Sequence, residues 1–132
     1  MARIMVVDDS AFIRAKYSKA LTSGGFDVVE ARNGAEALEK YREYEPDGVL
    51  LDVNMPVMDG IVTLHELIRL DQAACVALVT CAGNQSIVLS ALRCGASDCL
   101  NKPLDDSRIV TIANRLAQQH SMTEMGEACA CC

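Results

Sequence analysis

Hydrophobic and polar positions change their spacing along the chain in a regular way. Short apolar runs bounded by turn residues predict strands at residues 4–7, 26–29, 48–51, 75–79 and 98–100. Between these runs, apolar side chains recur every three or four residues, which predicts helices at residues 12–21, 33–45, 61–70, 86–94 and 105–119. The chain therefore repeats a strand followed by a helix from end to end.

Local signals support several of these boundaries. Gly24 and Gly25 are typical of a helix end. Asn33 with Glu36 three residues later resembles a capping box, and Pro46 ends the helix that this box opens.

Strands that alternate with helices need crossover connections, which produce a parallel sheet. The apolar runs are continuous rather than alternating, as expected for strands covered on both faces. We therefore predict one α/β domain with a doubly wound, five-stranded parallel sheet and helices on both faces.

Composition and charge limit the classes of function that are open to this protein. The chain has 132 residues, of which 51% are hydrophobic, and a net charge of −6. This balance argues against binding to nucleic acid, which depends on Lys and Arg neutralising phosphates. We find no apolar run long enough for membrane insertion and no secretory signal. Seven cysteines in such a chain suggest reduced thiols and a cytoplasmic location.

Polar side chains follow four of the predicted strands, at the point where each strand ends. Asp8 and Asp9 follow the first strand, Asp52 the third, Thr80 the fourth and Lys102 the fifth. Ligand sites in open parallel sheets lie beyond the carboxyl ends of the strands. Each residue alone has an ordinary structural explanation as a cap, a turn residue or a solvated side chain, but their joint placement favours a shared site.

Three carboxylates at one rim repel one another, so either a pKa is raised or a hard cation is bound. Oxygen ligands favour Mg²⁺ or a similar ion. With a cation in place, one carboxylate can act as a nucleophile toward phosphorus. An ammonium and a hydroxyl would then stabilise the oxygens of the transferred group.

At this point the sequence resembles the receiver domain of two-component response regulators. The resemblance extends from residue 2 to about residue 119 and is carried by Thr80 and by the runs VVDDS (6–10), LLDVNMPVMDG (50–60), GASD (95–98) and KP (102–103). It implies a flavodoxin-like sheet with strand order 2-1-3-4-5.

The resemblance also implies a role for each site residue. Asp9 is expected to be the main Mg²⁺ carboxylate, Asp8 to contribute partly through water, and Asn54 to offer its backbone carbonyl to the metal. Asp52 is expected to be the phosphoacceptor and also to contribute to the metal site.

Lys102 is expected to pair with the phosphoryl group, and Thr80 to follow that group by hydrogen bonding. The peptide bond between Lys102 and Pro103 resembles the family's cis bond. One position departs from the pattern, because Cys99 occupies the place where many receivers have a Tyr or Phe that switches rotamer. A thiol cannot sweep out the volume of a ring, so coupling from Thr80 to the surface is expected to differ.

The resemblance predicts a phosphoryl donor, either a sensor histidine kinase or a histidine phosphotransfer protein, and a downstream target protein. We expect a receiver domain at residues 1–119 and a short flexible tail at residues 120–132, too short for an output domain. The protein is thus expected to be a monomeric, stand-alone regulator of chemotaxis or phosphorelay type. It would not be an enzyme beyond accepting and slowly losing its own phosphoryl group.

Other interpretations stay open. A pseudo-receiver would bind partners without phosphoryl turnover, and an aspartyl phosphohydrolase would need an acid where this chain has Asn54. The tail cysteines Cys129, Cys131 and Cys132 allow a thiol or metal function. The basic residues of the first helix, Arg14, Lys16 and Lys19, are interpreted as a solvated face, with contact to a partner as the alternative.

Overall fold

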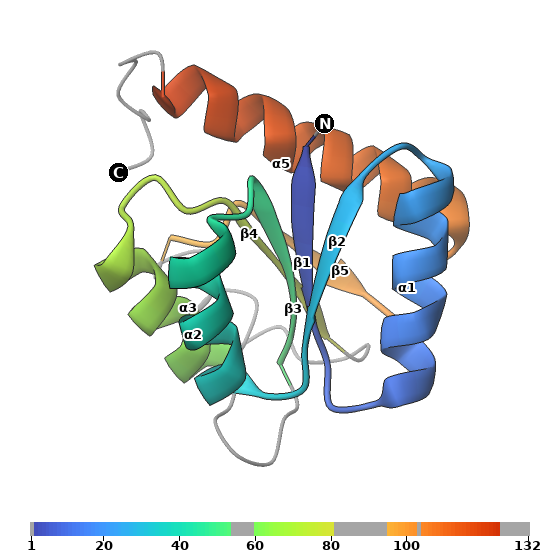
Figure 1. Cartoon of the computed structure of the whole chain (residues 1–132), viewed down its shortest axis with the longest axis horizontal. Helices are drawn as coiled ribbons and strands as arrows, with labels where there is room; N and C mark the ends of the chain where they lie inside the picture. The colour runs from blue at the N-terminus through green and yellow to red at the C-terminus, as the bar shows by residue number, and fades with distance from the viewer. Residues whose placement is uncertain (1, 54–59, 81–94, 103, 125–132) are drawn as a thin grey trace.

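The computed structural model describes residues 2–53, 60–80, 95–102 and 104–124 (Figure 1). Its strands are β1 (Arg3–Val7), β2 (Asp27–Ala31), β3 (Gly48–Asp52), β4 (Val76–Thr80) and β5 (Asp98–Asn101). Its helices are α1 (Ala11–Ser23), α2 (Gly34–Tyr44), α3 (Gly60–Leu70) and α5 (Asp106–Glu124). The helix predicted at residues 86–94 lies outside the described residues.

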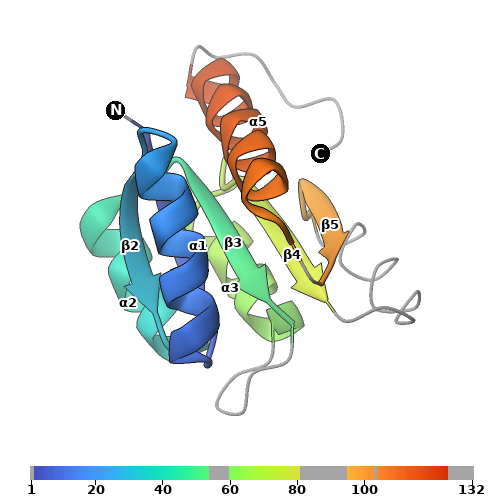
Figure 2. The ribbon, with the colours of Figure 1, turned by 90° about the vertical axis from the view of Figure 1, so that its right-hand side faces the viewer.

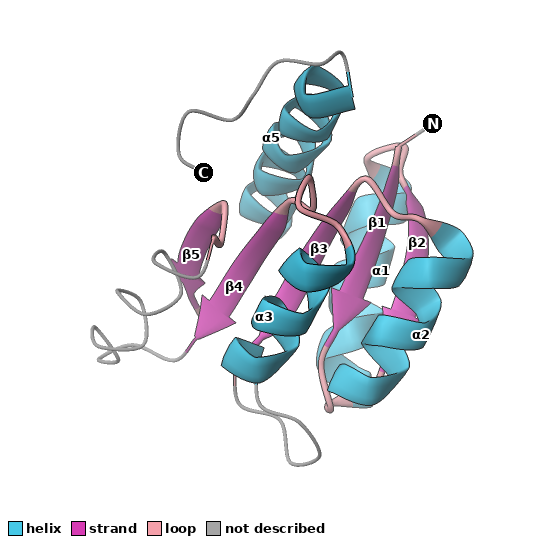
Figure 3. Cartoon of the chain, turned by 90° about the vertical axis from the view of Figure 1, so that its left-hand side faces the viewer, coloured by secondary structure: helices cyan, strands magenta, loops and turns pink. Residues whose placement is uncertain are grey.

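The strands form one parallel sheet in the order β2-β1-β3-β4-β5, which confirms the predicted topology. Neighbouring strands are closely in register, with Val7 opposite both Ala31 and Leu51, and Asp52 opposite Val79. Because every strand points the same way, all of their carboxyl ends lie at one edge of the sheet (Figure 3).

Helices cover the sheet on both sides, α1 and α5 on one face and α2 and α3 on the other (Figure 2). Successive strand residues point to opposite faces, so β1 sends Ile4 and Val6 into the first layer and Met5 and Val7 into the second. Every residue of β3 and β4 is buried. The continuous apolar runs in the sequence reflect this double burial.

Side-chain caps set the starts of two helices, and the sequence predicts the one at Asn33. Ser10 accepts a hydrogen bond from the amide of Ile13 at the start of α1, and Asn33 accepts one from the amide of Glu36 at 2.9 Å. Glu36 reaches back to the amide of Arg32 at 3.2 Å. These bonds satisfy amides that have no partner within the helix.

Two predicted boundaries were wrong, one for a local reason and one because of a contact between distant segments. The second strand starts at Asp27 rather than Phe26, because the amide of Phe26 donates to the carbonyl of Leu21 and closes the end of α1. The last helix continues to Glu124 instead of ending near residue 119. Its residue His120 is buried, with Nδ1 3.2 Å from a carboxylate oxygen of Asp47.

Within the described residues, no helix is long and apolar enough to cross a membrane.

Candidate functional site

Four strand ends bring the predicted site residues to one rim of the sheet. Asp8 follows β1, Asp52 and Thr80 are the last residues of β3 and β4, and Lys102 follows β5. Since β1, β3, β4 and β5 are neighbours in the sheet, these side chains share one stretch of its carboxyl edge. This edge is the place where open parallel sheets bind their ligands.

The carboxylates of Asp8, Asp9 and Asp52 form a compact cluster at this rim. One oxygen from each lies within 4.8 Å of the others. Asp8 and Asp52 are buried at 2% and 3% exposure, whereas Asp9 is exposed. Two carboxylates of the cluster are therefore buried, and the third is accessible to ions from solution.

Lys102 supplies a positive charge to this cluster. Its Nζ lies 3.3 Å from Asp8 Oδ2 and 3.3 Å from Asp52 Oδ1. Burial alone would lower the pKa of Lys102, but the carboxylates of Asp52 and Asp8 outweigh burial and raise that pKa above its ordinary value. Lys102 is thus a charged ammonium, and one ammonium does not balance three carboxylates.

The turn after β1 fixes Asp8 from several sides. Its amide donates to the carbonyl of Ala31 at 3.2 Å, and its Oδ1 accepts from the amide of Ser10 at 2.9 Å. Ser10 then caps α1, so the helix begins directly after the acidic pair. Sequence alone suggests the acidic pair, but only the structure shows how firmly the turn holds its first member.

Thr80 is fully buried at the end of β4. Its carbonyl oxygen accepts a hydrogen bond from the amide of Lys102 at 2.8 Å. The ladder between β4 and β5 therefore continues to the residue that carries the ammonium. This bond couples the backbone positions of Thr80 and Lys102.

Gly60 is the first residue of α3 and lies against the backbone of Asp52, the phosphoacceptor candidate. Its amide donates to the carbonyl of Val53 at 2.9 Å. A Cβ at this position would lie 2.6 Å from the carbonyl oxygen of Asp52 and 2.5 Å from Cα of Val53. No side chain fits there, so glycine allows the helix to approach the strand that carries Asp52.

Some sequence predictions fall outside the described residues. These are the backbone carbonyl of Asn54, the bond to Pro103, and the tail cysteines Cys129, Cys131 and Cys132. Cys99 is described: it lies on β5 opposite Leu78, half-buried. Burial and the neighbouring Asp98 raise the pKa of its thiol, which therefore favours the protonated form.

Sequence reasoning missed two residues near the site. The sequence predicts a solvated helix face for Arg14, but its side chain is only 12% exposed and donates to the carbonyl of Asp8. Tyr17 is buried on the same helix. Burial, together with the charges of Asp8 and Asp52, raises the pKa of Tyr17 although Lys102 acts against them.

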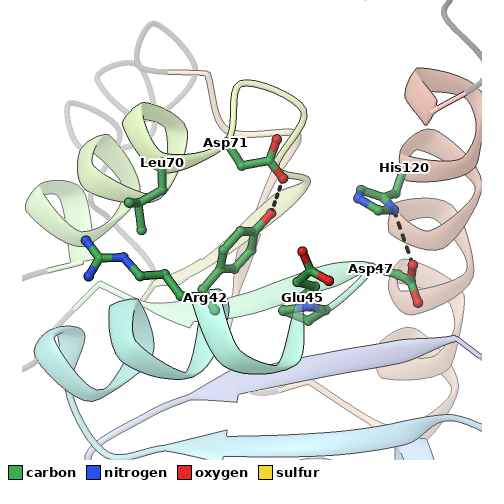
Figure 4. Close-up of a pocket in the computed structure, with 8 residues that line it drawn as sticks. Arg42, Glu45, Asp47, Leu70, Asp71 and His120 are labelled. Atoms are coloured by element: carbon green, nitrogen blue, oxygen red, sulfur yellow. Dashed lines mark hydrogen bonds and ion pairs between the residues drawn. The ribbon is translucent and has the colours of Figure 1, made fainter.

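A hollow lies at the opposite end of the sheet, where the strands begin (Figure 4). Its volume is about 550 Å³. The carboxylate of Asp71 accepts from the hydroxyl of Tyr41 at 2.7 Å, and that of Asp47 accepts from the amide of Arg3 at 2.8 Å. Asp47 also lies beside His120, so these carboxylates tie elements of the fold together.

Comparison with known proteins agrees with the fold. The family model for the response regulator receiver domain matches residues 4–114. The chain is 43% identical to the chemotaxis protein CheY of Bacillus subtilis over 86% of this chain and 95% of that protein. It is 38% identical to the CheY of Thermotoga maritima over 88% and 98%, respectively.

A solved structure gives the same result at the level of the backbone. The crystal structure of a response regulator receiver domain protein from Clostridium thermocellum superimposes with a TM-score of 0.88. The two are 25% identical, and the match covers 93% of this chain and 99% of the other. The chain therefore belongs to the CheY-like receiver domains, the family of the response regulators of two-component signalling.

Proposed function

We propose that this response regulator accepts a phosphoryl group on Asp52 with Mg²⁺ bound beside it, and passes the signal on by docking to another protein. The observation that carries the proposal is the rim cluster. Three carboxylates lie within 4.8 Å of one another, and Lys102 Nζ is 3.3 Å from two of them. The family membership supports the same function.

The donor set fits a hard divalent cation. The candidate ligands among the described residues are carboxylate oxygens, and Mg²⁺ prefers oxygen ligands. One ammonium leaves the cluster with an excess of negative charge, which a divalent ion would balance. Asp8, Asp9 and Asp52 would hold Mg²⁺, and the backbone carbonyl of Asn54 remains a proposed fourth ligand. When bound, Mg²⁺ would neutralise charge on the phosphoryl oxygens.

Asp52 is the proposed nucleophile because it ends a fully buried strand and its carboxylate belongs to the cluster. A carboxylate oxygen of Asp52 attacks phosphorus, forming an O–P bond while the P–N bond of a phosphohistidine breaks. The electron pair of the broken bond stays on the imidazole nitrogen, which takes a proton from water. The product is an aspartyl phosphate.

Lys102 and Thr80 would respond to the new group. The ammonium would move from the carboxylate of Asp52 to a phosphoryl oxygen, and the hydroxyl of Thr80 would donate to another. Their backbones are linked by a 2.8 Å hydrogen bond, so a displacement of either residue would displace the other. A phosphoryl group adds roughly −1.5 to −2 charges, enough to bias a two-state surface.

The proposed donor is a phosphohistidine on a sensor kinase or phosphotransfer protein, and the proposed receiver of the signal is another protein. With 18 acidic and 12 basic residues, the chain is poorly suited to nucleic acid. We propose no enzymatic turnover beyond slow hydrolysis of the protein's own aspartyl phosphate.

Incubation with acetyl phosphate tests the proposal. Intact-mass spectrometry should show one added phosphoryl group in the presence of Mg²⁺, and none after chelation by EDTA. Asp52→Asn keeps the size of the side chain and should stay unmodified. If wild type binds no Mg²⁺ and gains no phosphoryl group from acetyl phosphate or a phosphohistidine donor, the protein is a pseudo-receiver that acts by binding alone.

A further inference from the structure

We propose that Arg14 is a positioning residue for the Mg²⁺ site, holding the turn that presents Asp9. This inference rests on the proposed function, because it concerns the same cluster of carboxylates. The observation behind it is one side chain with two anchors. Arg14 Nη1 donates to the backbone carbonyl of Asp8 at 2.6 Å, and its Nε lies 3.3 Å from Glu30 Oε1.

The placement of Arg14 is unusual for a basic residue on the outer helix of a sheet. Its side chain is only 12% exposed and runs back from the first turns of α1 to the end of β1. A solvated arginine would lose conformational entropy by being held in this way. Two charge-assisted interactions offset that loss and fix the guanidinium in one place.

The acceptor on Asp8 matters because of peptide geometry. The carbonyl of Asp8 and the amide of Asp9 belong to one planar unit, so a bond to this oxygen also orients the start of Asp9. Asp9 is exposed, and packing therefore does little to hold it. By contrast, the side chain of Asp8 is already fixed by Ser10 and Lys102. Arg14 thus acts on the member of the cluster that most needs support.

Glu30 gives the guanidinium of Arg14 a fixed acceptor. It lies on β2, whose register with β1 places it opposite Val6. The carbonyl of Glu30 accepts in turn from the ammonium of Lys40 on α2. A series of contacts therefore runs from α2 through β2 to the turn that carries the acidic pair. Arg14 makes the last contact in this series.

The direction of the change in Mg²⁺ affinity distinguishes a positioning role of Arg14 from a purely electrostatic one. A guanidinium close to the cluster repels a divalent cation, so removing its charge alone should strengthen Mg²⁺ binding. Loss of positioning should weaken it, since partners that orient metal ligands are typically worth about 10- to 100-fold in affinity. Arg14→Ala therefore gives opposite predictions for the two explanations.

Isothermal titration of the full chain with MgCl₂ alone is the experiment. We expect Arg14→Ala to bind Mg²⁺ about tenfold more weakly than wild type. The control Lys16→Ala removes the same charge from an exposed position of α1 and should bind as well as wild type or slightly better. Circular dichroism melts establish that each variant is folded.

Arg14→Lys covers the case in which Arg14→Ala fails to fold. It keeps the positive charge but loses the fork that reaches two acceptors, so it should also bind Mg²⁺ more weakly. If wild type binds Mg²⁺ and both Arg14 variants bind equally well or better, the inference is wrong and the proposed function stands. If wild type binds no Mg²⁺, the metal step of the proposed function fails and the inference fails with it.

Discussion

The ammonium of Lys102 lies 3.3 Å from a carboxylate oxygen of Asp52, although their strands β5 and β3 are separated in the sheet by β4. The lysine side chain therefore passes over the end of β4 to reach the central strand. The proposed nucleophile is therefore already paired with a cation before any phosphoryl group would arrive. The same ammonium would compete with the proposed Mg²⁺ for these carboxylates.

The substitution Lys102→Met is expected to have opposite effects on metal binding and on chemistry. Mg²⁺ should bind more tightly, because the carboxylates of Asp8 and Asp52 lose a competing cation. Phosphorylation by acetyl phosphate should slow by at least about tenfold, because a donor to the phosphoryl oxygens is lost. Titration calorimetry and a mass-spectrometric time course measure the two effects. Weaker Mg²⁺ binding in the variant would contradict the competition.

The raised pKa of Lys102 also makes a prediction about pH. Because Asp52 and Asp8 hold this pKa above its unfolded value, the charged lysine contributes stability fully below about pH 10. That contribution is lost as pH rises through the folded pKa. Urea unfolding at pH 7 and above pH 10 should show a smaller alkaline loss of stability in Lys102→Met than in wild type.

Asp9→Asn should separate stability from metal binding. Without metal, the variant should gain up to about 0.5 kcal/mol of unfolding free energy, since one of three clustered charges is removed. Wild type should gain about 2.7 kcal/mol at a Mg²⁺ concentration of 100 times the Kd, and the variant much less at that concentration. Thermal unfolding with and without MgCl₂ checks both effects. A variant stabilised by Mg²⁺ as strongly as wild type would exclude Asp9 as a ligand.

Tyr41→Phe tests the bond that joins α2 to the segment after α3. The hydroxyl of Tyr41 donates to Asp71 at 2.7 Å, and its loss should cost about 1.5 kcal/mol because the acceptor is charged. Burial and Asp71 raise the pKa of Tyr41, so its contribution to stability is present below about pH 10 and lost at higher pH.

The control for this bond is Tyr44→Phe, three residues further on and 39% exposed. Urea unfolding at neutral pH should show little change for the control and a clear loss for Tyr41→Phe. Equal losses in the two variants would mean that the hydroxyl of Tyr41 contributes nothing specific.

Gly60→Ala should damage the fold and the site together. The added Cβ would meet the backbone of Asp52 and Val53 at about 2.6 Å and 2.5 Å, and backbone cannot move aside as a side chain does. We expect a loss of about 1–3 kcal/mol and slower phosphorylation. Gly24→Ala is the control, because its Cβ would meet the side chain of Val110, which can turn away. Equal stability of the two variants would contradict the close approach.

Much of the fold and the rim could be predicted because the signals are local or follow from topology. The buried run before Asp52 marks a central strand by composition alone, and Asn33 with Glu36 marks a helix start. Once the strands are known to be parallel, Asp8, Asp52, Thr80 and Lys102 must share one edge. No pairwise contact had to be known for that step.

The missed features depend on contacts between distant segments. The sequence predicts that Arg14 is a surface residue, because only the register of β1 and β2 shows that Glu30 lies beside it. The extension of α5 through His120 depends on Asp47, more than 70 residues earlier in the chain. Periodicity carries no information about which polar side chain will find a buried partner, so these features had to come from the structure.

The position of β5 has a consequence for how the site responds. This strand lies at the margin of the sheet and pairs only with β4, and its residues are less buried than those of β3. Segments with a single neighbour and fewer buried contacts open at lower free energy than the core. The proposed nucleophile, Asp52, therefore lies on a fully buried strand with two neighbours, while Lys102 follows a less buried strand with one. We therefore expect a change of charge at Asp52 to displace the edge of the sheet more than its centre.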